Sequence, residues 1–76
     1  MEQKLQKIFR ETFNKPNLIL KDDLDASQVD TWDSFNHINL IINVEEEFNI
    51  RFTTEEISMV ENVGQFKELV NRKIDV

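Results

Sequence analysis

The stretch Asp33–Phe48, DSFNHINLIINVEEEF, is the clearest helix signal in the chain. Asp33 and Ser34 at its start are residue types that cap helix N-termini. Three glutamates near its end oppose the helix dipole, which is tolerated where those charges have another use. The stretch is predicted to be an amphipathic helix over residues 34–48. Its apolar positions at helical spacing are Phe35, Ile38, Ile41, Ile42, Val44 and Phe48.

Three further segments carry helix patterns. Residues 2–14 have apolar side chains at helical spacing. Thr53 with Glu56 is typical of a capping box before a short helix, and Asn62 with Gln65 repeats that pattern before a last helix. The apolar residues that define these segments are Leu5, Ile8, Phe9 and Phe13, then Ile57 and Val60, then Val63, Phe66, Leu69, Val70 and Ile74.

Residues 15–33 show no sustained periodicity. Pro16 disfavours helical geometry at the residue before it, so the first helix is expected to end near Asn14. A few apolar residues, including the run 18–20, are expected to pin this long connection to the helices. The sequence therefore predicts an all-α fold: one domain over residues 1–76, a small four-helix bundle with a long loop between its first two helices and a short third helix.

Composition excludes several classes of function. The 76 residues include no cysteine, which excludes disulfide scaffolds, thiolate metal sites and cysteine nucleophiles. A net charge of −6 disfavours nucleic acid and anionic membrane surfaces and favours partners with basic patches. No signal segment and no apolar run long enough to span a bilayer is present. We therefore expect a cytoplasmic monomer that neither binds nucleic acid nor inserts into membranes.

Ser34 has two explanations at this level. Either Asp33 or Ser34 could simply be the N-cap of the helix, with no other purpose. Alternatively, the Ser34 hydroxyl lies where a helix dipole and free amides favour an anion, so a phosphodiester would suit it, and Asp33 could help hold a divalent cation while a partner enzyme adds that group. Catalysis by Ser34 with His37 is not expected, because a triad also needs an orienting partner and an oxyanion hole.

The motif Asp33-Ser34-Phe35 resembles the Asp-Ser-Leu modification motif of acyl carrier proteins. The resemblance continues through the second helix to Phe48, and again in residues 50–52, 54–57 and 62–66. It covers essentially the whole chain in order and spacing.

The resemblance implies that Ser34 receives 4′-phosphopantetheine from coenzyme A through a magnesium-dependent phosphopantetheinyl transferase. Acyl or aminoacyl cargo would then be carried as a thioester on the arm, as in fatty acid or polyketide biosynthesis. The implied further partners are an acyl-loading ligase or acyltransferase and a downstream synthase or transferase. The chain itself is expected to be a carrier and not an enzyme, with no catalytic residue and no metal ligand of its own.

The resemblance also implies that the second helix and the loop before it recognise partners. Whether Phe35 is exposed or buried is left open by periodicity alone. His37 is expected at the surface, where it would tune partner contact. The residues assigned to this recognition surface are Trp32, Asp33, Phe35, His37, Ile42, Glu45 and Glu46.

The chain departs from the housekeeping fatty-acid carrier near the motif. Trp32 stands where glycine is common, Phe35 replaces leucine, and asparagines occupy positions 36, 39 and 43, where that carrier tends to have acidic or small residues. These departures indicate a specialised carrier that serves one pathway. We expect it to be a poor substrate for the general fatty-acid enzymes.

A free-standing enzyme is disfavoured by the single histidine and the thin core, and two other interpretations compete with a carrier. The window 23–34 begins like a calcium-binding loop, but Gln28 stands where the loop needs glycine and Ser34 where it needs a bidentate glutamate. The other rival is an interaction domain of the same fold that is never modified. The intact Asp33-Ser34 pair argues against it.

Overall fold

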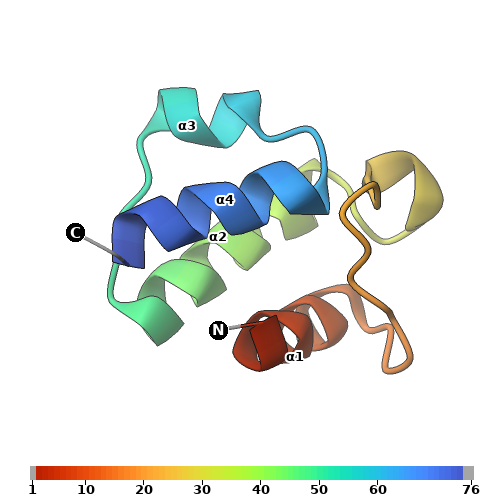
Figure 1. Cartoon of the computed structure of the whole chain (residues 1–76). Coiled ribbons are helices and arrows are strands. Elements are labelled where there is room, and N and C mark those ends of the chain that lie inside the picture. Colours follow the sequence, from red (N-terminus) through yellow and green to blue (C-terminus); the bar gives the residue numbers. More distant parts are fainter. Residues whose placement is uncertain (1, 75–76) are drawn as a thin grey trace.

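Four α-helices form the chain in its computed structural model, which describes residues 2–74. They are α1 (Glu2–Phe13), α2 (Ser34–Phe48), α3 (Thr54–Met59) and α4 (Val63–Ile74). Figure 1 shows α1 along one side of the molecule and the short α3 on the opposite side, with α2 and α4 between them. The predicted all-α, four-helix architecture is confirmed.

Two asparagines end the first two helices. Asn14 and Asn49 both have φ of 55°, the left-handed conformation that asparagine tolerates better than most residues. The prediction that α1 ends near Asn14 is therefore confirmed, since the left-handed turn at Asn14 ends the helix at Phe13. The predicted bounds of α2 are confirmed.

The predicted caps of α3 and α4 are present with one difference. Thr53 and Glu56 form the reciprocal capping box. Asn62 Oδ1 accepts from the Gln65 amide at 2.9 Å, but the Gln65 side chain reaches back to the amide of Glu61 at 2.8 Å and not to that of Asn62. The Gln65 side chain thus holds Glu61, one residue farther into the loop before α4 than a capping box would.

The core is centred on an aromatic cluster. Phe9 lies at its middle and packs edge-on against Phe13, Trp32 and Phe66, with ring centroids 5.7, 5.8 and 5.9 Å away. These rings join α1, α4 and the end of the long loop. The other buried residues of the cluster are Leu5, Leu24, Val29, Leu40, Ile41, Val44, Val63 and Val70.

The long loop is anchored to the helices by its backbone as well as by buried side chains. The carbonyls of Asp22 and Leu24 accept from the amides of Gly64 and Val63, respectively, both at 2.9 Å. These bonds provide acceptors for two amides at the start of α4, which have none within the helix. Glycine at position 64 favours this approach, because a Cβ there would lie only 3.1 Å from both the Cβ and the carbonyl oxygen of Asp22, so that Asp22 would have to shift slightly. The loop also holds one turn of 3-10 helix, η1 (Ala26–Gln28), which the sequence pattern did not indicate.

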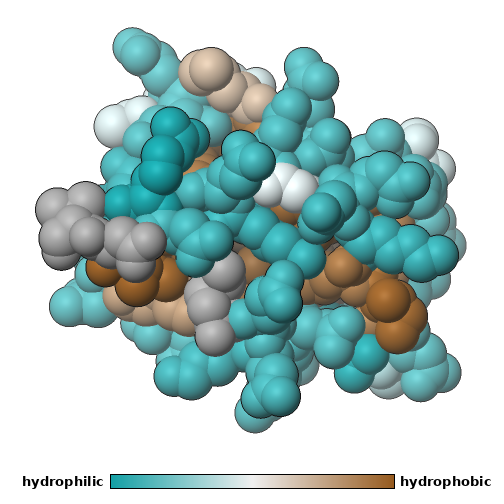
Figure 2. All heavy atoms as spheres, viewed as in Figure 1, coloured by the Kyte–Doolittle hydropathy of each residue, from teal (hydrophilic) through white to brown (hydrophobic). Residues whose placement is uncertain are grey.

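Hydrophilic residues cover most of the face seen in Figure 2, and hydrophobic side chains show between them in limited areas. No helix within residues 2–74 has the length and apolar character needed to cross a bilayer.

Candidate functional site

Asp33 is the cap of α2, and Ser34 is the first residue of the helix. The Asp33 backbone is extended, and its Oδ1 accepts from the Asn36 amide at 2.8 Å. Ser34 is exposed, and no residue within 2–74 forms a hydrogen bond with its hydroxyl. The choice between Asp33 and Ser34 as the cap is thus decided, and it leaves the serine oxygen free at the positive end of the helix.

The start of α2 is tied to the end of α1 by two hydrogen bonds. Thr31 Oγ1 donates to the Phe13 carbonyl at 2.7 Å, and Asn36 Nδ2 donates to the Thr31 carbonyl at 2.8 Å. Farther along, Asn43 Nδ2 donates to Thr12 Oγ1 at 3.0 Å. Asparagines of α2 therefore join it to the rest of the bundle, and Ser34 is presented from a fixed position.

Trp32 lies in the core beneath the site. Its side chain is 8% exposed, stacks on Phe13 with ring centroids 5.2 Å apart, and meets the edge of Phe9. Trp32 was assigned to partner recognition, which stays a prediction, and the ring fills the space at the end of the α1–α2 connection. Its role is to hold the residues before Ser34 in place.

His37 is half-buried against Trp32 instead of standing free at the surface as expected. Its ring lies edge to edge with the indole, with centroids 6.3 Å apart and ring planes within 16° of parallel, and its Nδ1 accepts from Trp32 Nε1 at 3.1 Å. Burial lowers the pKa of His37. The hydrogen bond acts in the same direction, because a protonated Nδ1 would be a donor facing a donor.

His37→Phe should therefore cost stability in a pH-dependent way. Phenylalanine keeps an aromatic ring beside Trp32 but leaves the indole N–H without its partner, so we expect a loss of about 1 kcal/mol at pH near 8. A histidine with a lowered pKa stabilises the fold above its unfolded pKa of about 6.5 and loses that contribution as pH falls. Urea unfolding of both proteins at pH 8 and at pH 5.5 should show the gap shrinking at the lower pH. An equal gap at both would contradict the neutral, hydrogen-bonded histidine.

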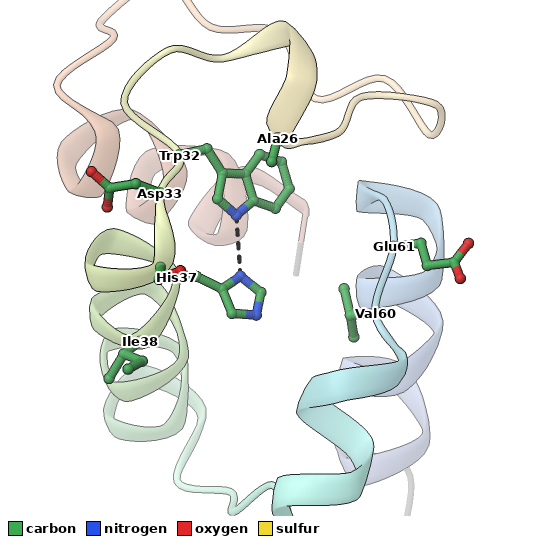
Figure 3. A pocket seen from close by; sticks show the side chains of 8 residues that line it. Ala26, Trp32, Asp33, His37, Ile38, Val60 and Glu61 are labelled. Atoms are coloured by element: carbon green, nitrogen blue, oxygen red, sulfur yellow. Dashed lines mark hydrogen bonds between the residues drawn. The ribbon is translucent and has the colours of Figure 1, made fainter.

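A groove of about 570 Å³ opens beside Ser34. Figure 3 shows α2 on one side of it, the segment before α4 on the other and η1 above. It is open to solvent. Its lining residues are Ala26, Trp32, Asp33, Ser34, His37, Ile38, Val60 and Glu61.

The exposed face of α2 carries large apolar side chains. Phe35 is 74% exposed, Ile38 58% and Ile42 44%, and their spacing places them along one stripe that begins next to Ser34. The open question about Phe35 is thus answered in favour of exposure. Ile38 was missed as a surface residue because its spacing also fits the buried face of the helix, and only the packing of α2 distinguishes the two.

The two acidic residues assigned to partner recognition lie in different settings. Glu46 is exposed, whereas the Glu45 carboxylate accepts from the Phe52 amide at 2.8 Å and holds the connection between α2 and α3. Within the described part of the chain, no three histidine, aspartate or glutamate side chains are grouped so that they could hold a metal ion.

Two solved structures share this arrangement over 96% of the chain. One is the holo acyl carrier protein from Geobacter metallireducens, with 34% identity, a TM-score of 0.91 and 84% of that chain covered. The other is an acyl carrier protein from Thermotoga maritima, with 26% identity, a TM-score of 0.82 and 85% covered. Comparisons with protein-family models and with curated protein sequences gave no match.

Proposed function

The chain belongs to the acyl carrier protein family, and from this premise we propose that Ser34 is its attachment point for 4′-phosphopantetheine. Members of the family are carriers, and this chain is accordingly a carrier and not an enzyme. The observation that carries the proposal is the free, exposed hydroxyl of Ser34 in the first turn of α2, beside a cap supplied by a different residue.

The electrostatics of the helix start favour a phosphodiester on Ser34. The first amides of a helix have no partner within the helix, and the dipole of the 15-residue α2 places partial positive charge there. Asp33 occupies the Asn36 amide, which keeps the helix start intact without drawing on the serine oxygen. Modification of Ser34 would therefore cost the fold no existing hydrogen bond.

The arm would supply the thiol that the protein lacks, since the sequence contains no cysteine. Acyl or aminoacyl groups would be carried on it as thioesters. The groove beside Ser34 offers the arm and its cargo a path along α2 with apolar side chains in part of its wall. Positioning is the contribution of this chain, and partner enzymes perform the chemistry.

Partner enzymes are proposed to dock on the exposed face of α2. Phe35 and Ile42 present apolar area on this face, and Glu46 adds negative charge that a basic partner surface would complement. We propose that the phosphopantetheinyl transferase, the loading ligase or acyltransferase, and a downstream synthase or transferase use this face. The proposed setting is the cytoplasm, with the chain acting as a monomer in one biosynthetic pathway.

The test is the intact mass of the chain after incubation with coenzyme A, magnesium and a promiscuous phosphopantetheinyl transferase. The expected result is a mass gain of one phosphopantetheine. A known carrier loaded in parallel controls for transferase activity, and circular dichroism controls for folding. No gain by the folded chain, with both general and pathway-specific transferases, would instead favour an unmodified interaction domain.

Phe35→Ala tests the docking face separately. We expect kcat/KM for transferase loading to fall roughly tenfold, which is the effect of losing one well-packed aromatic contact at an interface. The matched control is Met59→Ala, which removes an equally exposed apolar side chain, at 74%, from α3. Equal loading rates for the wild type and Phe35→Ala would place the docking face elsewhere.

A further inference from the structure

The groove beside Ser34 contains one polar group that the carrier role leaves without a function, the imidazole of His37. Trp32 Nε1 is 3.1 Å from His37 Nδ1. An indole N–H can only donate, so Nδ1 must be the unprotonated nitrogen, and the neutral ring carries its proton on Nε2. The contact with Trp32 therefore fixes a single tautomer.

The remaining N–H of His37 faces the groove. In Figure 3 the ring extends from α2 into the gap, and the nitrogen that is not bonded to Trp32 lies on the side of Val60. No residue within 2–74 accepts a hydrogen bond from this nitrogen. The carboxylates of Asp33 and Glu61, which also belong to the lining residues, point away from the ring.

The donor lies within reach of a chain tethered to Ser34. Residues three apart on a helix are surface neighbours, with Cβ atoms about 5–6 Å apart. A chain that leaves the serine oxygen and enters the groove comes near the ring of His37, because both residues line this groove and lie one helical turn apart on α2. This N–H has no protein acceptor within residues 2–74, so a carbonyl oxygen brought into the groove can take the place of water as its acceptor.

We infer that His37, oriented by Trp32, is a positioning residue that donates a hydrogen bond from Nε2 to a carbonyl oxygen of the chain carried on Ser34. The inference rests on the proposed function, because that modification supplies the chain. Two carbonyl oxygens could accept this hydrogen bond: that of an amide in the arm and that of the thioester formed with the cargo. The hydrogen bond would hold part of the chain against α2 and determine how far it enters the groove.

The experiment is nuclear magnetic resonance of the His37 imidazole in the ¹⁵N-labelled full chain at pH near 7.5. Three forms are compared: unmodified, loaded from coenzyme A so that the arm ends in a free thiol, and loaded from butyryl coenzyme A. Nitrogen shifts of the unmodified form should show the Nε2–H tautomer. In the butyryl form we expect the Nε2 proton to move downfield and to exchange with water roughly tenfold more slowly, the factor that one hydrogen bond of about 1.4 kcal/mol produces.

The three forms also identify the acceptor. The same change in the free-thiol form would assign it to an amide of the arm, and a change only in the butyryl form would assign it to the thioester carbonyl. Intact mass is measured on each sample first. Absence of loading would contradict the proposed function itself, whereas complete loading with unchanged His37 signals in both loaded forms would overturn this inference alone.

Two variants separate hydrogen bonding from packing. His37→Phe keeps an aromatic ring against Trp32 but has no donor, so a ¹³C-labelled carbonyl in its loaded form should lose the shift that it shows in the wild type. Trp32→Phe retains a buried ring and releases Nδ1, so His37 should sample both tautomers and the carbonyl shift should shrink. A carbonyl shift that is equal in the wild type and in His37→Phe would also overturn the inference.

Discussion

Ser34→Ala is expected to abolish phosphopantetheine loading completely while the fold remains intact. The hydroxyl is the only group at this position that a transferase could modify, so no mass gain should occur at any enzyme concentration. Stability should change by no more than about 0.5 kcal/mol, because Ser34 is exposed and alanine is the best helix former. The cap is supplied by Asp33 and survives the change.

The matched control is Ser58→Ala. Ser58 is an exposed serine within α3, and its hydroxyl donates only to the Glu55 carbonyl of its own helix. This variant should load like the wild type when followed by intact mass over time. Loading of Ser34→Ala, or loss of loading in Ser58→Ala, would contradict the assignment of the attachment point. Thermal unfolding of both variants shows whether either result reflects the fold.

Phe9→Ala is expected to remove about 3–5 kcal/mol from the free energy of unfolding. Phe9 is completely buried and contacts three other aromatic rings, so truncation leaves a cavity that its rigid neighbours cannot fill. Small domains are stable by only about 5–15 kcal/mol, and a chain of this length lies toward the lower end. A substantial fraction of the variant should be unfolded at 37 °C. Urea unfolding followed by circular dichroism measures the change.

Phe35→Ala provides the comparison for this prediction, because it removes the same side chain from a position that is 74% exposed. Its unfolding free energy should stay within about 0.5 kcal/mol of the wild type. Phe9→Ala would thus lower stability, whereas Phe35→Ala would weaken partner recognition and leave stability nearly unchanged. Similar losses in both variants would mean that Phe35 is buried in solution.

Caps and periodicity were enough to predict the helices. The spacing of apolar residues in 34–48 and the capping box of Thr53 and Glu56 are local signals, because they involve residues close together in the chain. The structure has the predicted helix and the predicted capping box at these positions. The turn η1 was missed because three residues are too few to show a period. The end of α1 was predicted near Asn14 from Pro16, and in the structure the left-handed turn at Asn14 ends the helix at Phe13.

The sequence by itself determined the all-α class, the bounds of α2, and Ser34 as the candidate site, because each depends on neighbours along the chain. Only the tertiary structure decided which side chains around that site are free. Packing of α1 against the long loop buries Trp32, and the buried Trp32 donates a hydrogen bond that fixes the ring of His37. The same packing turns Phe35 outward, since period alone cannot say which face of an amphipathic helix meets the core. The groove beside Ser34 exists because residues 26 and 60–61, far apart in the chain, are brought to the same end of α2.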